Sequence, residues 1–521
     1  MHKDLGDKNF SGLLTLVAKS SIFALFGITF AKGVNYLFRI GIARYFGPES
    51  YGLFSLGMAI AGWFMALATL GLNEGLSRYI PLYRGNKEEE KIKYLVRFSL
   101  TFLTITGILS AAILFFSAEL IAQEFFHNQE LTIFIRLFSI AIPLVVIAHP
   151  FLSIIRSYEK IGWYSFIVNI LQSLVKIGFL AIFILAGASH SSTATAHLIA
   201  LASILIFSYL VCKHYFSHLL VKSLLNKKDK KALRKEVWTY SSPLLFLSLI
   251  STILYWVDSI FLGYYKGIAE VGLYNAALPI AALLSVVPEI FMLIFFPLIT
   301  KEYGAGRKKV IFELSKQVSK WIFLLNLPLF LLIVLFPGAA INLLFGAKYL
   351  PAETSLQFLS AGMFLSSVLV ISTYLITMLG KSKLNLMNVV LASVMNVVLN
   401  IILIPIPNIW FIDNSTGLPG ASIATLISII FLNGLFLFQV YKNLHFIPFR
   451  RKNLLVILSA VLPTLFVLIF RSFIQEVTFV LLLLLVIGFF LLYFISLYLF
   501  GSLDKNDIFI LYRFRKKLLR R

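Results

Sequence analysis

The sequence predicts an all-α integral membrane protein, with about fourteen transmembrane helices in two pseudo-symmetric six-helix lobes plus two C-terminal helices. Three observations support this prediction. The 521 residues are 59% hydrophobic and only 13% charged, whereas about a quarter of the residues in soluble domains are charged. Apolar segments long enough to cross a bilayer recur along the chain. A short sequence pattern also returns at one fixed spacing.

The predicted spans follow from length and hydropathy. A helix rises about 1.5 Å per residue, so about 20 apolar residues cross the hydrocarbon core. The segments that meet this requirement are 20–43, 51–75, 93–117, 131–155, 161–186, 194–214, 238–263, 271–299, 318–345, 354–379, 384–406, 418–441, 453–472 and 477–500.

The distribution of lysine and arginine predicts the orientation. With the N-terminus inside, 38 of the 46 Lys and Arg residues lie in inside segments and four lie in outside loops. This asymmetry follows the positive-inside rule and predicts that both termini are cytoplasmic. The net charge of +23 therefore indicates a face toward anionic inner-leaflet lipids rather than a nucleic-acid site. We expect a multi-pass protein of the cytoplasmic membrane.

The same patterns predict the organisation of the chain. The single cysteine, Cys212, excludes an intrachain disulfide. The first apolar segment lacks a small-residue cleavage site, which indicates a retained span. The predicted parts, in chain order, are an amphipathic cytoplasmic N-terminus (1–19), an N-lobe (20–214), a basic linker (215–237), a C-lobe (238–441), two further helices (442–500) and a basic cytoplasmic tail (501–521).

An internal repeat predicts the two lobes. Gly47, Gly52 and Leu53 return 220 residues later as Gly267, Gly272 and Leu273. The same offset aligns Phe116, Ile121 and Phe125 with Phe336, Ile341 and Phe345. Six predicted helices separate the copies, and an even number keeps both in the same orientation. In such folds the substrate path lies near mid-membrane at the lobe interface, and one lobe rocks against the other.

Three stretches carry a family resemblance: Arg44–Phe54 (RYFGPESYGLF), Asp258–Gly263 with Gly272–Ala276, and Asn396–Pro405 followed by Gly417, Gly420 and Ala421. In these the chain resembles the polysaccharide transporters, the lipid-linked oligosaccharide flippases of the multidrug/oligosaccharidyl-lipid/polysaccharide exporter superfamily. The resemblance covers nearly the whole chain. It implies a polyprenyl-(pyro)phosphate-linked glycan as substrate, moved from the inner to the outer leaflet for cell-surface polysaccharide assembly. It also makes glycan-assembly proteins candidate partners.

Cations within predicted spans are the first candidate site residues, because a charge at bilayer depth normally faces a cavity or a partner. Lys32 and Arg39 lie two turns apart on one helix, and Lys176 lies deep in another. Arg136 begins a third predicted span. We expect these four cations to surround a phosphate or pyrophosphate group. The alternatives are an interhelical ion pair for Lys32 and Lys176, and snorkelling to the outer boundary for Arg39 and Arg136. Asn169 and Gln172, which share a helix stripe with Lys176 and Ser173, complete the substrate-binding prediction.

Two acidic residues are candidates for coupling to H⁺ or Na⁺. Asp258 lies in the predicted span 238–263 and could exchange protons between states. Its alternative role is a fixed salt bridge to the first helix. Glu289 follows Pro288 in a span that two further prolines interrupt, and it is the weaker candidate.

Asparagines form a second pattern, because Asn385, Asn388, Asn396 and Asn400 share one face of a predicted helix. We expect interhelical hydrogen bonds from them, with sugar contact as the alternative. Asn414-Ser-Thr is a glycosylation sequon on a predicted outside loop, and we give it little weight because sequons often occur by chance.

The rival functions are a cation-coupled drug or metabolite antiporter of the same superfamily, a membrane glycosyltransferase or polymerase, and a structural scaffold. The antiporter predicts an acid-lined pocket in the first lobe, whereas cations line this one. No phosphate-binding GxxxxGK[ST] loop occurs, and the outside loops are short and lack a paired acidic motif. We therefore predict a non-enzyme and assign no catalytic residue, metal or cofactor. A scaffold does not explain charges at mid-membrane.

Overall fold

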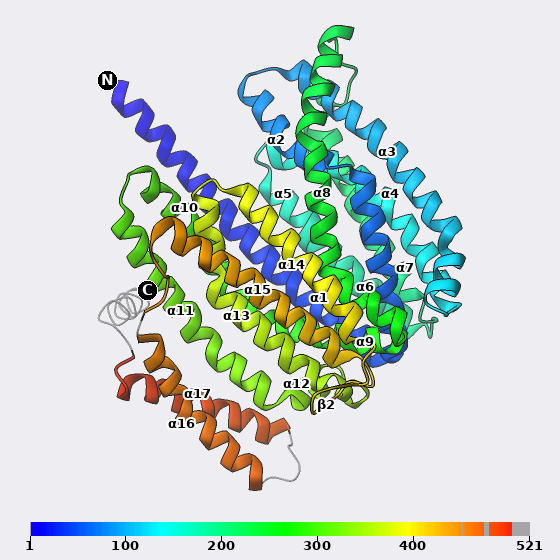
Figure 1. Cartoon of the computed structure of the whole chain (residues 1–521). Helices are drawn as coiled ribbons and strands as arrows, with labels where there is room; N and C mark the ends of the chain where they lie inside the picture. The colour runs from blue at the N-terminus through cyan, green and yellow to red at the C-terminus, as the bar shows by residue number, and fades with distance from the viewer. Residues whose placement is uncertain (1, 451, 474–478, 503–521) are drawn as a thin grey trace. The chain divides into compact units, whose positions relative to one another are not determined.

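The computed structural model describes residues 2–450, 452–473 and 479–502. It is almost entirely helical (Figure 1). Most of the predicted basic tail, from residue 503 onward, lies outside the described residues, as do the side chains of the predicted N-terminal segment 1–19. The chain forms two compact units, Met1–Asn275 and Ala276–Arg521. This boundary differs from the predicted one, which placed the linker 215–237 between the two lobes. The division into lobes stays a prediction.

The first unit contains the helices up to α9. They are α1 (His2–Thr69), α2 (Leu72–Gly85), α3 (Glu89–Leu120), α4 (Glu130–Ser157), α5 (Ile161–Ser165), α6 (Gln172–Leu185), α7 (Ser192–Tyr215), α8 (Lys227–Tyr265) and α9 (Ile268–Ala282), which crosses into the second unit. Two π-helical segments extend α3 and join α5 to α6, namely Ile121–Phe125 and Phe166–Leu171, and a short 3₁₀ helix, Ser217–Leu219, follows α7.

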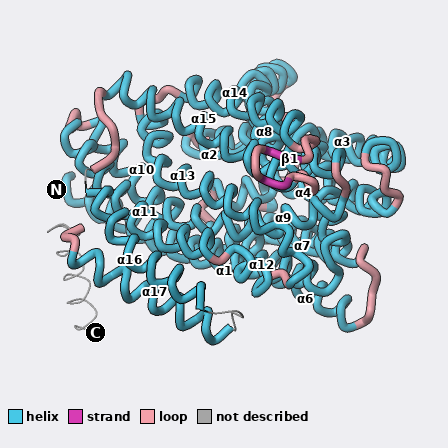
Figure 2. Tube along the Cα trace, turned by 60° about the horizontal axis from the view of Figure 1, so that its bottom comes forward, coloured by secondary structure: helices cyan, strands magenta, loops and turns pink. Residues whose placement is uncertain are grey.

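The second unit contains the remaining helices and one small hairpin. The helices are α10 (Val286–Gly304), α11 (Lys308–Leu335), α12 (Pro337–Leu344), α13 (Glu353–Met378), α14 (Ser382–Leu403), α15 (Leu418–Leu444), α16 (Lys452–Phe473) and α17 (Phe479–Leu499), with 3₁₀ turns at Leu283–Ser285 and Ala347–Ala352. The antiparallel hairpin of β1 (Asn408–Ile409) and β2 (Ile412–Asp413) joins α14 to α15 (Figure 2).

The described residues contain eleven helices that are long and apolar enough to span a membrane, or twelve if the bent α8 counts as one span. Three differences separate this count from fourteen. The first predicted span and most of the second lie together in α1, so they count as one. The helix α8 bends within its length, and the apolar part of α17, Leu483–Leu499, is shorter than a full span. The all-α membrane fold is confirmed, and the count of fourteen stays a prediction.

Backbone breaks explain where helices depart from the predicted spans. Gly47 has φ 86° inside α1 and divides it into two arms. The predicted span 51–75 is wrong as one helix, because Leu70 and Gly71 adopt positive φ and separate α1 from α2. Phe336 likewise separates α11 from α12 within the predicted span 318–345. Hydropathy averages over such breaks, so it does not detect them.

The repeat reappears as a reciprocal contact inside the first unit. A Cβ added to Gly52 would lie 1.9 Å from the Ile268 carbonyl oxygen, and one added to Gly272 would lie 1.9 Å from the Pro48 carbonyl oxygen. Ile268 is the repeat partner of Pro48, just as Gly272 is that of Gly52. Contacts of residue i with j and of j with i are typical of twofold symmetry. α1 and α9 therefore cross on two glycines related by the 220-residue offset.

Polar side chains join helices of the second unit. Asn388 on α14 and Gln439 on α15 exchange hydrogen bonds of 2.9 and 2.8 Å. Asn396 donates to the Thr425 hydroxyl at 3.3 Å. The predicted interhelical role is confirmed for these two asparagines. An apolar core of the same unit joins α10, α11, α13 and α15, with buried residues such as Phe295, Ile322, Leu375 and Phe436.

Candidate functional site

Two predicted cations meet in the interior of the first unit. Lys176 on α6 is 6% exposed and donates from Nζ to the Asn35 Oδ1 on α1. Its ammonium also lies 4.8 Å from the centre of the Phe38 ring. Arg39, one turn further along α1, donates to the Tyr51 hydroxyl at 3.4 Å and also hydrogen-bonds Tyr255 on α8. The kink at Gly47 folds α1 back, which allows Arg39 and Tyr51 of one helix to meet.

The network continues from Tyr51. Its hydroxyl donates to the Asn275 carbonyl oxygen at 3.0 Å. The Asn275 amide in turn donates to the Ser259 hydroxyl on α8 at 2.9 Å. Tyr51 thus connects Arg39 on α1 to Asn275 on α9, the helix that crosses α1 at the two glycines.

A third basic side chain, His197, lies near Arg39 and Lys176, and the sequence analysis missed it. His197 on α7 packs edge-on against Phe54 and Phe138, with ring centroids 5.9 and 6.0 Å away. It lies close enough to Lys176 and Arg39 to interact with their charges. Among the described residues, its buried Nδ1 atom has no hydrogen-bond partner. A histidine near the start of the apolar span 194–214 was the available signal. We name Arg39, Lys176 and His197 the cationic cluster.

No carboxylate of the described residues balances the charges of Arg39 and Lys176. Arg39 and Lys176 are close enough to repel each other. Among the side chains that the structure describes, neither forms an ion pair with a carboxylate. Placing unpaired cations in a membrane interior is costly, so such groups normally face a polar partner or cavity. The cluster is therefore suited to hold an anion.

Asp258 lies buried on α8, 7% exposed. Its Oδ2 atom accepts a 2.6 Å hydrogen bond from the hydroxyl of Tyr274, which is fully buried on α9. This carboxylate thus joins α8 to α9, which is one of the two helices of the glycine crossing.

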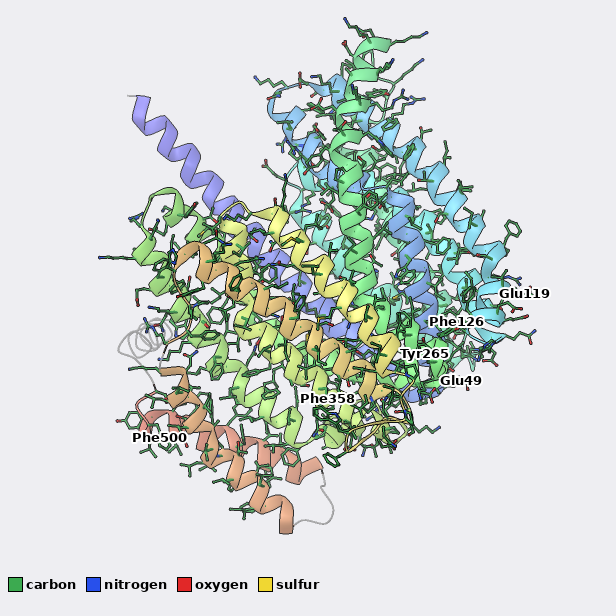
Figure 3. The ribbon with its side chains drawn as sticks, viewed as in Figure 1. Glu49, Glu119, Phe126, Tyr265, Phe358 and Phe500 are labelled. Atoms are coloured by element: carbon green, nitrogen blue, oxygen red, sulfur yellow. The ribbon has the colours of Figure 1, made fainter. Side chains whose placement is uncertain are left out.

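The other predicted substrate residues lie in different surroundings. The side chain of Arg136 is 42% exposed and pairs at 3.3 Å with Glu119 of α3, which Figure 3 shows at the outer edge of the helices. Lys32 is half-buried on α1, about two turns before Arg39. Asn169 donates to the Ser165 hydroxyl at 3.1 Å within the π-helical segment. Gln172 lines a cavity of about 390 Å³ between α2, α4, α6 and α7.

In the second unit, Glu289 lies on an exposed face of α10 and accepts a 3.1 Å hydrogen bond from Ser285. The sequence analysis named no candidate cation in the second unit. Lys320 is fully buried within α11.

Comparisons with known proteins identify the family. The model of a family described as "Polysaccharide biosynthesis protein" matches residues 17–303, which is more than half of the chain. The model of the MatE family matches residues 243–402.

Individual relatives agree with the family models. An uncharacterized membrane protein of Methanocaldococcus jannaschii is 25% identical over 462 residues, covering 86% of this chain and 88% of that protein. The "Putative O-antigen transporter" of Shigella flexneri is 24% identical over 441 residues, covering 82% and 98%. A solved structure of the lipid II flippase MurJ, in an inward closed conformation, matches with a TM-score of 0.70 at 16% identity, covering 92% of this chain and 98% of that one.

The family match and the relative that is named as a transporter indicate a transporter rather than an enzyme. The chain belongs to the polysaccharide biosynthesis protein family and is a multi-pass membrane transporter of the multidrug/oligosaccharidyl-lipid/polysaccharide exporter superfamily.

Proposed function

We propose that the chain is a flippase, which moves a polyprenyl-(pyro)phosphate-linked oligosaccharide across the cytoplasmic membrane by alternating access. The observation that carries the proposal is the cationic cluster, in which Lys176 is buried, Arg39 and His197 are partly buried, and neither Arg39 nor Lys176 has a described carboxylate partner. A phosphate or pyrophosphate supplies the missing negative charge. The Shigella flexneri relative, whose name refers to O-antigen transport, and the structural match to a lipid II flippase support the same substrate class.

Each predicted residue takes a role in this proposal. Arg39 offers a planar fork of donors to phosphate oxygens, and Lys176 supplies a point charge. Lys32 is the next cation along α1 and would receive the headgroup before the cluster does. Asn169 and Gln172 would contact sugar hydroxyls. Arg136, exposed and paired with Glu119, fits the interface role better than the cavity role.

Coupling to an ion gradient is assigned to Asp258. A buried carboxylate that accepts a hydrogen bond from Tyr274 can take up a proton or bind Na⁺, and either change would alter its contact with α9. Glu289 is the second coupling candidate. We further propose that both termini are cytoplasmic, and that proteins of glycan assembly are the partners that supply and consume the lipid.

The test is a flipping assay in liposomes with a fluorescent polyprenyl-pyrophosphate oligosaccharide. We expect wild-type protein to move the lipid, Lys176→Ala to lose at least tenfold in rate, and Asp258→Asn to lose only the dependence on an imposed ion gradient. Arg136→Ala is the matched comparison for Arg39→Ala. If both arginine variants lose activity equally, the separation between cluster and interface is wrong.

The second candidate is a cation-coupled multidrug or metabolite antiporter, favoured by the MatE match over residues 243–402. The same liposomes decide between the two. Export of cationic dyes without movement of the glycolipid would replace the flippase proposal with the antiporter. The cationic cluster argues against this result, because it repels cationic drugs.

A further inference from the structure

A cavity of about 390 Å³ lies inside the first unit, between α2, α4, the helix pair α5–α6 and α7. Its volume falls in the range of about 300–1,000 Å³ that is usual for small-molecule sites. The polar side chains that the argument uses are Asn73, Glu74, His149, Arg156, Tyr164 and Gln172, set against apolar walls from α4 and α7. Of these, the sequence analysis identified only Gln172.

The polar side chains of this cavity have no partners among the part of the chain that the structure describes. Among the described residues, none of the six side chains makes a hydrogen bond or ion pair, although Glu74 and Arg156 carry opposite charges and line the same space. The Asn73 Oδ1 atom is fully buried and has no hydrogen-bond partner. Buried polar atoms in folded proteins are nearly always satisfied. These donors and acceptors are therefore arranged for a ligand or for water.

The cavity has a mouth and an inner end. Arg156 lies at the last turn of α4 and is exposed, and Tyr164 follows the loop after that helix. This loop is on the predicted cytoplasmic side. From Arg156 to Val145, the innermost lining residue of α4, the helix runs about 16 Å. At the inner end Gln172 lies one turn before Lys176 on α6, so the cavity leads toward the cationic cluster.

We propose that this cavity is a subsite for uncharged, hydroxyl-rich sugar residues of the transported glycan. A sugar ring presents hydroxyl groups, which amides, a carboxylate and a guanidinium recognise, and apolar C–H faces, which the walls of α4 and α7 receive. One acidic and one basic side chain leave the cavity without a net charge, so it does not compete with the cationic cluster for phosphate. The proposal rests on the flippase function and assigns the glycan and the phosphate to adjacent places on α6.

The first experiment measures transport selectivity in proteoliposomes. The probes are fluorescent polyprenyl pyrophosphate without sugar and the same lipid carrying an oligosaccharide. We expect Asn73→Leu to lower the ratio of kcat/KM for the glycosylated lipid to that for the sugar-free lipid about tenfold. Gln123→Leu, at an exposed position outside the cavity, is the matched control and keeps the wild-type ratio. An unchanged ratio in Asn73→Leu overturns the proposal.

A structural role for Asn73 is separated by thermal stability. Because its buried oxygen is unsatisfied, replacing it with leucine removes an orphaned acceptor and does not lower the melting temperature. A variant that loses glycan selectivity at unchanged melting temperature supports the subsite. If Asn73→Leu lowers both the glycan selectivity and the melting temperature, and Asn73→Gln restores neither, then Asn73 has a packing role and the subsite proposal is overturned.

The second experiment is independent of transport, so failure of the subsite and failure of the flippase function can be told apart. Cys212→Ser removes the only cysteine, and Ser153→Cys then puts a thiol in the cavity wall. We expect N,N′-diacetylchitobiose, maltose or the glycosylated lipid to slow its alkylation by N-ethylmaleimide. Protection without flipping keeps the subsite and rejects the flippase. Absence of protection by all three probes overturns the subsite.

Discussion

At the scale of single residues, Asn414 shows how a polar side chain can be fully committed to the fold. Its amide nitrogen donates to the carbonyl oxygens of Leu403 and Ile406 at 2.7 and 2.6 Å, and its Oδ1 accepts from the Gly420 backbone N–H at 2.7 Å. The side chain is fully buried. It therefore ties the end of α14 to the start of α15. The glycosylation sequon at this position has a structural explanation, since the amide is not accessible.

We expect Asn414→Ala to destabilise the protein by about 2–4 kcal/mol, because it leaves three backbone groups without partners. Asn408→Ala, at an exposed position in the neighbouring hairpin, is the control and should change stability little. Thermal unfolding of the purified variants in detergent measures the difference. Equal melting temperatures for the two variants would show that water replaces the lost hydrogen bonds.

The sequence predicts part of the candidate site at this scale. Arg39 and Lys176 are identified because lysine and arginine are rare within spans. His197 is missed because an imidazole can be neutral, so it does not stand out as a charge. Lys320 is missed because a cation near the end of a span is counted with the adjacent loop. The cavity lined by Asn73 and Gln172 is missed because five helices contribute its lining, and no single sequence pattern connects them.

At the scale of elements, the crossing of α1 and α9 depends on two glycines without room for a side chain. We expect Gly52→Ala and Gly272→Ala each to destabilise the protein by about 1–3 kcal/mol, as overpacking of a filled contact does. Gly434→Ala is the control, since a Cβ there meets no atom within 4 Å. Alanine at that helical position should stabilise slightly.

Thermal unfolding of the three glycine variants tests the reciprocity of the crossing. The two crossing variants should behave alike, because each places a Cβ against the carbonyl oxygen of the other helix. A large effect at one glycine and none at the other would contradict a symmetric contact.

The β1–β2 hairpin exposes two aromatic side chains at its tip. Trp410 is 93% exposed and Phe411 fully so. Aromatic rings at loop tips are enriched at the membrane–water interface. We expect brominated lipids to quench the emission of Trp410, measured as the difference between wild type and Trp410→Phe. Trp63 is half-buried and serves as the control. Its emission, measured as the difference between wild type and Trp63→Phe, should be quenched less than that of Trp410.

The existence of most elements could be predicted from hydropathy, but their breaks could not. Apolar residues run on through Leu70 and Gly71, so composition gives no sign that the chain turns there. The break between α9 and α10 is different, because three prolines in the segment predicted a bent helix. The β1–β2 hairpin was not predicted, since its two-residue strands are too short for any alternating pattern.

At the scale of the whole molecule, the charge asymmetry predicts which loops face the cytoplasm. In a Cys212→Ser background, single cysteines are placed at the exposed positions Asn86, Ser189, Ala305 and Asn408. We expect a membrane-impermeant maleimide to label Ser189→Cys and Asn408→Cys in intact cells, and the other two only after permeabilisation. The opposite result would reverse the orientation, and a mixed result would change the number of spans.

The contact between Asn35 and Lys176 also bears on how the chain is made. The two residues are 141 positions apart. At a synthesis rate of about 5–20 residues per second, the partner of Asn35 emerges roughly 7–30 s after Asn35 itself. Arg39 waits longer still for Tyr255. During that time the first helix carries its arginine without the helices that later surround it. We therefore expect the translocation machinery, or the lipid headgroups, to shelter α1 until both α6 and α8 have been made.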